Sequence, residues 1–454
     1  MIQQENSHEL ETQPIGNLLV KFSIPCIISL LVSALYNIVD QIFIGQGVGY
    51  LGNAATSVAF PLVTIAFAIA LMIGDGSGAF FALKIGEKDM KTTGAIVGNC
   101  IIMLTVVGVA LAAISLIFLK DILTLFGATE AVMQYAVDYT GIIAIGIPFA
   151  IFSTGFNSVI RSDGNPKFSM ISMLIGAIVN TILDPIFIFY FGLGVKGAAY
   201  ATVLGQLCSA ILALYYLKKF RNLTFNKSLI KFDKTIALTI LKFGISSFIT
   251  QMSIAIVAIC TNKVLTNYGA NSVYGSEIPL SIFGIVTKVN QIMLSILLGV
   301  AVGAQPILGF NYGAKNMKRV KQTVKIAIIS GLIISAVGLV CFQVFPQQIV
   351  NIFGSGDILY NEFGVMYFRI FLACCMLNSV QTISTIFFQA IGQPLHAGLL
   401  SLSRQIIFYL PAVFLLPIFM GIKGALFAGP LADSLAFILA VILMRIKMKK
   451  IHIA

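Results

Sequence analysis

The sequence GSGAFFALKIGEKDMK, residues 76–91, is matched without a gap by GAQPILGFNYGAKNMK, residues 303–318, at an offset of 227 residues. Three further matches occur in the same order along the chain and at similar offsets: Lys21-Phe22 with Lys242-Phe243, GNP at 164–166 with GQP at 392–394, and VKGAAYA at 195–201 with IKGALFA at 422–428. Four ordered matches predict that one structural unit is duplicated, with one copy in each half of the chain.

The composition indicates what kind of unit is duplicated. The 454 residues have a mean hydropathy of +0.97, and only 10% of them are charged, against about 25% in soluble domains. Apolar windows of about 20 residues are long enough to cross a bilayer. The sequence therefore predicts an all-α polytopic membrane protein with twelve spans, near 17–44, 54–83, 93–118, 132–160, 167–191, 195–217, 235–262, 272–306, 322–344, 363–391, 396–418 and 422–444.

The basic residues predict the orientation of these spans. If the N-terminus is cytoplasmic, the inner loops and C-terminal tail contain twenty Lys and Arg residues, and the outer loops contain four. Such an excess marks the cytoplasmic side. Both termini are therefore expected in the cytoplasm, and the number of spans is expected to be even. The net charge of +12 is explained by this topology, and no nucleic-acid partner is expected, because a soluble basic face is missing.

Duplication and topology together predict the architecture. Six spans per half is an even number, so the two six-helix bundles have the same orientation and are related by a pseudo-two-fold axis along the membrane normal. We expect an N-terminal bundle at 1–217, a basic cytoplasmic linker at 218–234 and a C-terminal bundle at 235–454. Parallel halves are common in transporters that alternate between inward-open and outward-open states. A duplication with only a structural role is the alternative.

Two acids stand out within the apolar windows. Asp40 and Asp184 lie about five and seven residues from the outer ends of the first and fifth spans, and Thr202 lies about seven residues into the sixth. These three side chains are therefore expected at similar depth. Asn180 and Tyr36 each precede an aspartate by four residues, which places them on the same helix faces.

This group suggests an ion site. A carboxylate is costly inside a membrane and is seldom kept there without a partner or a function. Two close carboxylates cannot both ionise cheaply, so the pair is suited to hold a proton, and its oxygen atoms also suit Na⁺. The repeat-related positions in the second half hold Thr261, Gly429 and the Leu410-Pro411 stretch, so the fold itself does not require the acids. The alternative is a hydrogen-bonded clamp between helices.

Other polar residues have less specific interpretations. The GDGSG segment at 74–78 lacks the Lys-Ser/Thr end of a phosphate loop and is expected to pack helices closely, with one polar contact at Asp75. Lys288, within the eighth span, is expected either to pair with Glu277 or Asp433, or to contact a substrate anion in a cavity. Arg161 and Asp163 are expected to form a salt bridge in a loop.

Several classes of function are disfavoured by what the sequence lacks. The seven cysteines all lie in apolar segments without a C-x-x-C motif, and there are only three histidines. An enzyme is therefore not expected, and neither is a bound metal beyond the candidate Na⁺ site. No signal peptide is expected to be removed, because the N-terminus is acidic. No ATP-binding motif occurs, so active transport would depend on an ion gradient, and no organic cofactor is expected.

Several motifs resemble the multidrug and toxic compound extrusion (MATE) transporters, in particular the DinF/MepA-like branch. They are KFSIP at 21–25, Asp40 followed by QIFIG, RSDGNP at 161–166, Asn180-x-x-x-Asp184-Pro and VKGAAYAT at 195–202. The resemblance covers essentially the whole chain. It implies that Asp40, Asn180, Asp184 and Thr202 form a cation site for H⁺ or Na⁺, and that Pro25 is a kink in the first span. Members with an acidic pair in the seventh and tenth spans differ, because this chain has Gln251 in the seventh span and Arg369 and Asn378 in the tenth, so a Na⁺ site in the C-terminal half is not expected.

The same resemblance implies a function and a location. We expect an antiporter in the inner or plasma membrane of a prokaryote that exports organic cations or amphipathic drugs in exchange for H⁺ or Na⁺, acting as a monomer in the lipid bilayer. Lys288, Gln251 and Met173 are candidates for lining its cavity. The alternative is a flippase or exporter of a lipid-linked or anionic metabolite, which would line its cavity with several cations.

Overall fold

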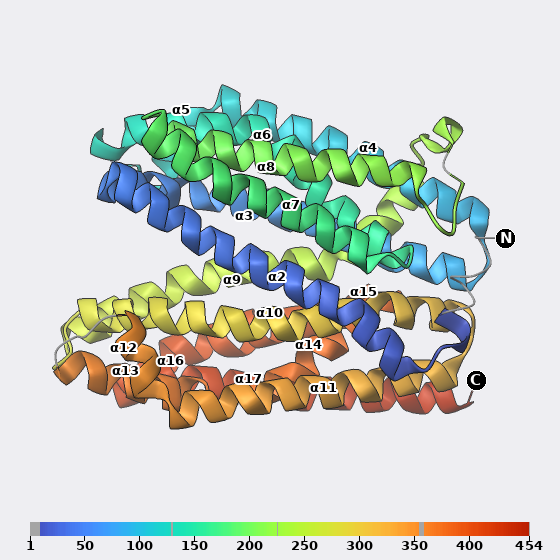
Figure 1. Cartoon of the computed structure of the whole chain (residues 1–454). Helices are drawn as coiled ribbons and strands as arrows, with labels where there is room; N and C mark the ends of the chain where they lie inside the picture. Colours follow the sequence, from blue (N-terminus) through green and yellow to red (C-terminus); the bar gives the residue numbers. More distant parts are fainter. Residues whose placement is uncertain (1–9, 129, 225, 354–357, 454) are drawn as a thin grey trace.

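A computed structural model describes residues 10–128, 130–224, 226–353 and 358–453 of the chain. Every regular element in these ranges is a helix (Figure 1). The long elements of the first half are α2 (Ile15–Val48), α3 (Tyr50–Gly86), α4 (Met90–Ile117), α6 (Glu130–Ser162), α7 (Pro166–Pro185) and α8 (Val195–Tyr215). Those of the second half are α9 (Lys234–Ala270), α10 (Glu277–Gly313), α11 (Met317–Val344), α13 (Ile358–Phe371), α14 (Cys375–Ala390), α15 (Pro394–Leu402), α16 (Leu410–Met420) and α17 (Ile422–Ile453).

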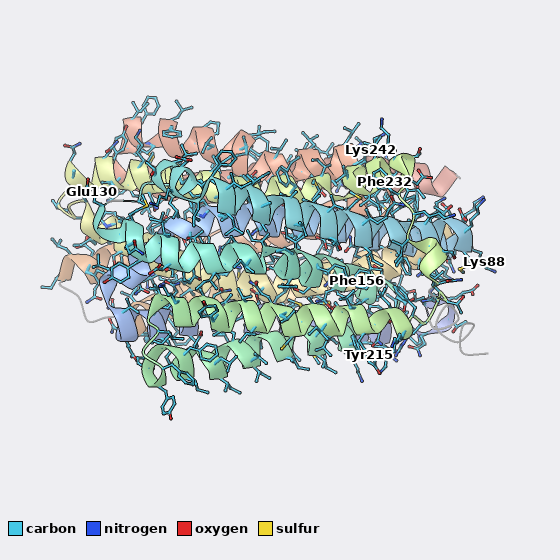
Figure 2. All side chains as sticks on the ribbon, turned by 90° about the horizontal axis from the view of Figure 1, so that it is seen from above. Lys88, Glu130, Phe156, Tyr215, Phe232 and Lys242 are labelled. Carbon is cyan, nitrogen blue, oxygen red and sulfur yellow. The ribbon has the colours of Figure 1, made fainter. Side chains whose placement is uncertain are left out.

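The helices confirm the predicted membrane architecture. Within the described residues, eleven helices are long and apolar enough to cross a membrane, and α13 and α14 form a twelfth span bent by 48°. The beginning of α2 and the end of α17 lie at the same end of the molecule, as an even number of spans requires (Figure 1). We call this end the terminal side and the opposite end the distal side. Lys88 and Glu130 lie at these two ends (Figure 2).

The duplication is visible in the helix boundaries. At an offset of 227 residues, both ends of α3 coincide with the ends of α10, and both ends of α4 coincide with those of α11. Short helices on the distal side follow the same rule: α5 (Leu119–Leu125) corresponds to α12 (Pro346–Phe353). The two halves are therefore copies of one six-span bundle, here called the N-lobe and the C-lobe.

Glycines at the terminal side place the pseudo-two-fold axis between α3 and α10. A Cβ atom on Gly86 would collide with the carbonyl oxygen of Phe310, and one on Gly313 would collide with that of Leu83. These two contacts are exchanged by the 227-residue offset. A second pair behaves similarly: Gly76 of α3 touches the backbone of α9, and Gly303 of α10 touches the backbone of α2. The lobes are thus joined backbone to backbone, which only glycine permits.

Some features were not predicted from the sequence. The short helices α5 and α12 and two π-helical segments, η1 (Ile186–Tyr190) and η4 (Ser403–Tyr409), lie within or beside apolar windows and do not change the hydropathy pattern. The eighth span was predicted at 272–306, whereas α10 occupies 277–313. Its terminal end continues past the apolar window because Asn311 is buried and donates hydrogen bonds to Leu10 O and Ile307 O.

The connection between the lobes packs against the N-lobe and contains two short 3₁₀ turns, η2 (Tyr216–Lys218) and η3 (Lys227–Leu229). The fully buried Asp163 carboxylate accepts hydrogen bonds from the Tyr216 hydroxyl and from the backbone N–H groups of Arg221 and Asn222. Burial raises the pKa of Asp163 to about 6, and the hydrogen bonds to its carboxyl group act in the opposite direction. The predicted Arg161–Asp163 salt bridge is therefore wrong, because Asp163 anchors the connection instead.

Candidate functional site

Helices α7 and α8 approach each other closely just below the predicted ion site. A Cβ on Gly205 would lie 2.5 Å from Gly176 O, so neither helix can carry a larger residue there without moving apart. One turn toward the terminal side, the hydroxyls of Ser172 and Ser209 each donate to the other residue's carbonyl oxygen, at 3.1 and 2.8 Å. This packing fixes the relative position of the polar residues that follow on both helices.

The structure brings together the four residues predicted to form the ion site. Asn180 Nδ2 donates to Asp184 Oδ1 at 3.3 Å within α7, and to Thr202 Oγ1 at 3.2 Å on α8. Helix α2 packs against α7 and places the Asp40 carboxyl group within hydrogen-bond reach of Asp184. Asp184 is fully buried, and Asp40 and Asn180 are 7% and 3% exposed. The expected common depth is confirmed by these contacts.

Three oxygen atoms of this site lack a hydrogen-bond donor. Asp40 Oδ1, Asp184 Oδ2 and Asn180 Oδ1 are buried, and no donor from the described residues reaches them. A buried acceptor without a donor is costly, and two carboxyl groups in contact need a positive charge or a proton between them. The donor set consists only of oxygen atoms, which suits a proton or a hard cation such as Na⁺. The site therefore fits the predicted ions chemically.

Two tyrosines border the site, and one of them was not predicted. Tyr36 lies one turn before Asp40 and within electrostatic reach of it, as expected. Tyr139 of α6 is 7% exposed and lies within electrostatic reach of Asp40, Tyr36 and Asp184. In the sequence, Tyr139 resembles an interfacial aromatic residue near the end of a span, so nothing there signalled its position. Helix α2 continues without a break through Pro25, and a kink at this residue remains a prediction.

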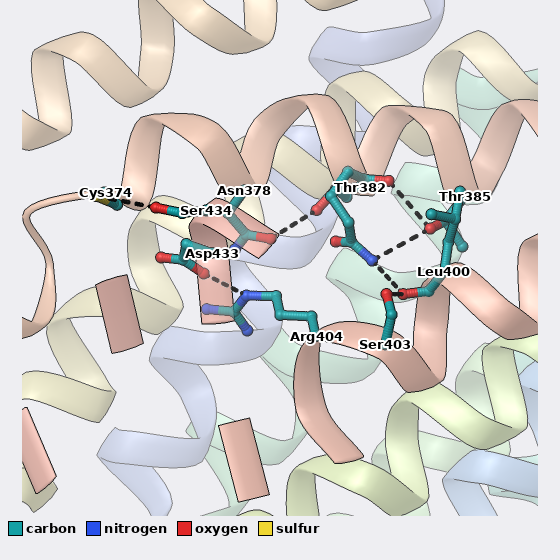
Figure 3. Close-up of polar contacts among 10 residues, drawn as sticks. Cys374, Asn378, Thr382, Thr385, Leu400, Ser403, Arg404, Asp433 and Ser434 are labelled. Atoms are coloured by element: carbon teal, nitrogen blue, oxygen red, sulfur yellow. Dashed lines mark hydrogen bonds and ion pairs between the residues drawn. The ribbon is translucent and has the colours of Figure 1, made fainter. Parts of the chain in front are cut away.

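The C-lobe contains a neutral contact at the corresponding place. Thr261, at the position related to Asp40, is 1% exposed, and its hydroxyl lies 3.1 Å from the Tyr409 hydroxyl, next to the Leu410-Pro411 stretch. Closer to the terminal side, Arg404 Nε donates to Asp433 Oδ1 at 2.6 Å (Figure 3). This acid is therefore neutralised by a neighbouring cation. At equivalent places, therefore, two carboxyl groups meet in the N-lobe, whereas two hydroxyl groups meet in the C-lobe.

The three candidate cavity residues differ in their surroundings. Lys288 is exposed and forms no ion pair with any described residue, and its predicted partner Asp433 pairs with Arg404 instead. The side chain of Glu277 lies outside the described residues. Gly299 of α10 touches Ile27 of α2. Lys288 lies about three whole helical turns before Gly299, so it is on the same face of α10, toward the N-lobe. Gln251 is half-buried and lies about two turns beyond Gly244, which touches α3. Met173 is half-buried on the Asn180 face of α7.

The GDGSG segment joins the lobes on the terminal side. Gly74 and Gly78 allow close packing against α6, as predicted. Asp75 Oδ1 accepts from the Ser158 hydroxyl at 2.7 Å and lies 3.5 Å from Arg161 Nη2, while Oδ2 accepts from the Ser247 hydroxyl of α9 at 2.9 Å. Gln389 Nε2 of α14 donates to the same Ser247 hydroxyl at 3.1 Å. The predicted single polar contact is therefore a network across both lobes.

Comparison with known proteins decides the family. The sequence pattern of the MatE family matches residues 25–186 and 262–415, one segment in each lobe and together more than half of the chain. The chain belongs to the MATE family. Its relatives place it in the MepA-like branch: "Multidrug export protein MepA" of Staphylococcus haemolyticus is 27% identical over 97% of this MATE chain and 95% of that protein. The Staphylococcus aureus (strain N315) protein of the same name is 25% identical over 97% and 96%.

Two solved structures have the same fold. One is described as the outward-facing conformation of a multidrug resistance MATE family transporter of the MOP superfamily; it matches with a TM-score of 0.92 and 23% identity, over 99% of both chains. A MATE in the bent conformation matches with a TM-score of 0.91 and 22% identity, also over 99% of both. At this identity, the likeness establishes that the MATE chain has the two-lobed fold.

Proposed function

We propose that this MATE-family protein is an antiporter that exports organic cations or amphipathic drugs in exchange for H⁺ or Na⁺ by alternating access. The relatives' name, multidrug export protein, supports the class of substrate. The buried oxygen atoms of Asp40, Asp184 and Asn180, which lack donors, carry the proposal of ion coupling. The protein would act as a monomer in a bacterial cell membrane, with lobes at 1–217 and 235–454 joined by the basic segment 218–234.

In this proposal, the proton enters between the Asp40 and Asp184 carboxyl groups. One proton shared by the pair supplies the missing donor and removes one negative charge from a buried site. Helix α2 then packs more closely on α7 and bends at Pro25, where the backbone donor is missing. Asp40, Asp184, Asn180 and Thr202 would hold Na⁺, which supplies positive charge there when bound. Ion and drug weaken each other's binding by the same factor, because coupling is reciprocal.

Transport in proteoliposomes tests the coupling. Efflux of a fluorescent organic cation would be measured with a pH gradient and a Na⁺ gradient imposed separately. We expect Asp40→Asn and Asp184→Asn each to abolish gradient-driven efflux while the purified protein stays monodisperse in detergent. Drug affinity of the unaltered protein should change with pH or with Na⁺ concentration. Efflux at the unaltered rate in either variant, or an affinity that is constant in both titrations, would contradict ion coupling at this site.

Lys288 favours a second candidate function, the export of substrates that carry an anionic group. It is an exposed cation without an ion-pair partner among the described residues, about eleven residues inside the distal end of α10. Charged residues at such depth usually face a water-filled pathway and mark the substrate or ion route. The face of α10 that bears Lys288 touches α2 at Gly299. A substrate carboxylate between the lobes would pair with this ammonium group.

Two dyes that differ only in whether one carboxyl group is free or an ethyl ester test this candidate. Rhodamine 6G is an ethyl ester and a cation, whereas rhodamine 19 is the corresponding carboxylic acid and a zwitterion at neutral pH. We expect Lys288→Met to slow transport of the acid relative to the ester by about tenfold or more, the value of one charge-assisted hydrogen bond. Lys263→Met, which removes another exposed lysine, should leave the ratio unchanged. An unchanged ratio in Lys288→Met would exclude this role.

A further inference from the structure

A groove opens on the surface of the C-lobe between α11 and α17, and α14 forms its floor. Its volume is about 820 Å³, and four cations line it: Lys321 and Lys325 from α11, and Arg445 and Lys449 from α17. The apolar lining includes Ile328, Val380, Phe437 and Val441. Both α11 and α17 pack on α14 (Figure 1).

No acid on these three helices pairs with Lys325, Arg445 or Lys449. Neither α11 nor α14 contains an Asp or Glu residue in its sequence. The sole acid of α17, Asp433, is buried and paired with Arg404, about three turns away from Arg445. Lys325, Arg445 and Lys449 therefore make the groove suited to an anionic ligand.

The charged and apolar residues are separated along the membrane normal. The cations lie toward the terminal side, within about 12 Å of where α11 begins and α17 ends. Phe437 lies eight residues before Arg445, about 12 Å deeper, and Ile328 lies about one turn deeper than Lys325. A ligand that fills this groove has a negative group at the level of the membrane surface and an apolar chain that reaches toward the bilayer centre.

The N-lobe shows what happens at the equivalent place. Lys321 and Lys325 correspond, at the 227-residue offset, to Gly94 and Gly98 of α4. A Cβ on Gly94 would lie 2.8 Å from the Leu229 side chain, and one on Gly98 would collide with Leu229 O. In the N-lobe, therefore, the chain's own interlobe segment covers this face, and glycines make room for it. In the C-lobe, two lysines take the place of the glycines beside an open groove.

We propose that the groove formed by α11, α14 and α17 binds one anionic phospholipid, with its phosphate between Lys325, Arg445 and Lys449 and an acyl chain along Val380, Phe437 and Val441. Basic pockets between membrane helices are suited to bind lipid headgroups on the cytoplasmic side. The lipid takes the place that the interlobe segment has in the N-lobe. This site is independent of the ion site and of the transported compound.

A single tryptophan reports on the groove, because the chain contains none. Phe437→Trp would be reconstituted in bilayers of brominated phosphatidylcholine, which quenches tryptophan on contact, and unbrominated phosphatidylglycerol or phosphatidylcholine would be added as competitor. We expect phosphatidylglycerol to relieve quenching with a relative binding constant several-fold above that of phosphatidylcholine. Each cation near the membrane surface is worth about fivefold, so adding Lys325→Gln and Arg445→Gln should lower the preference at least about fivefold, whereas Lys325→Arg with Arg445→Lys should keep it.

A matched control removes two exposed cations elsewhere. Lys91→Gln with Lys242→Gln takes the same charge from the terminal side of other helices and should leave the preference intact. If Phe437→Trp does not fold, native mass spectrometry of the protein with and without Lys325→Gln and Arg445→Gln gives the answer, as co-purified anionic phospholipid that the variant loses. The proposal would be overturned if both lipids had equal binding constants, or if the control pair lost the preference as much as the groove variant. It would also be overturned if the native mass spectrum showed two protein chains associated without bound lipid.

Discussion

Five buried aspartates, Asp40, Asp75, Asp163, Asp184 and Asp433, differ in whether their carboxyl oxygens have donors. Asp75 and Asp163 accept hydrogen bonds on both oxygens, and Asp433 is paired with Arg404. Asp40 and Asp184 instead face each other, and each keeps one oxygen without a donor. The sequence predicted this pair because depth along a helix follows from residue number. It could not predict which acids have donors, because Tyr216 and Ser247 come from distant parts of the chain.

Thr261→Ala tests the difference between the lobes at the level of one side chain. The substitution removes the hydroxyl that contacts Tyr409, at the position equivalent to Asp40. We expect the protein to lose about 1 kcal/mol of stability, the net value of one neutral hydrogen bond, measured as a small decrease of Tm in detergent. Ion-driven efflux should keep its dependence on the imposed gradient, because the C-lobe contact has no charge to neutralise. A complete loss of that dependence would show that the C-lobe forms part of the ion site.

At the level of elements, hydropathy predicted the spans because a bilayer requires apolar segments of one length, and the repeat predicted which spans correspond. The features that position the ion site were harder to predict from the sequence. The π-helical segment η1 follows Asp184-Pro185 directly, where proline removes a backbone donor, and η4 contains Arg404 and Tyr409. Neither segment has a residue pattern that distinguishes it from a regular helix: η1 is IFIFY and η4 is SRQIIFY. The close approach of α7 and α8 also depends on two glycines in different spans, whose contact no single-helix pattern reveals.

Gly205→Ala tests whether this close approach positions the ion site. The new methyl group would lie 2.5 Å from Gly176 O, so α8 must move away from α7 and draw Thr202 away from Asn180. We expect a loss of about 1–3 kcal/mol of stability, as for other overpacked sites, and weaker ion dependence of efflux. Gly16→Ala is the control, because nothing lies within 4 Å of its Cβ position and alanine favours a helix. Unchanged ion dependence in Gly205→Ala would separate the helix contact from the site.

At the level of the whole molecule, the glycine contacts that join the two lobes lie toward the terminal side. Backbone contacts at Gly86, Gly244 and Gly303 join them toward the terminal side. On the same face of α10 as Gly299, which touches α2, Lys288 is exposed. Positive charge on the terminal side predicts that the joined half is cytoplasmic. The sequence predicted two lobes, but the glycine contacts between them join residues from distant parts of the chain, so no local pattern of residues records them.

Ser247→Ala tests whether the Asp75–Ser247–Gln389 network stabilises this arrangement. The substitution removes the C-lobe hydroxyl that donates to Asp75 Oδ2 in this network. It also removes the oxygen atom that accepts the hydrogen bond from Gln389 Nε2. A hydrogen bond to a charged group is worth about 1.5–3 kcal/mol. We therefore expect the equilibrium between the two states of the proposed alternating access to shift by roughly ten- to a hundredfold toward the state that is open on the terminal side.

Spin labels at Lys91→Cys and Lys318→Cys, exposed and repeat-related positions at the terminal ends of α4 and α11, would report the shift as a longer distance between the lobes. The labels need a background in which the other reactive cysteines are replaced. Thr250→Ala, one turn away, is the control, because its hydroxyl donates only within α9, to Ser246 O. If Ser247→Ala and Thr250→Ala gave the same distance distribution as the unaltered protein, the glycine contacts and the apolar packing between the lobes, such as Phe80 on Phe243, would be sufficient to hold them together. The network would then serve to satisfy the buried Asp75 carboxylate.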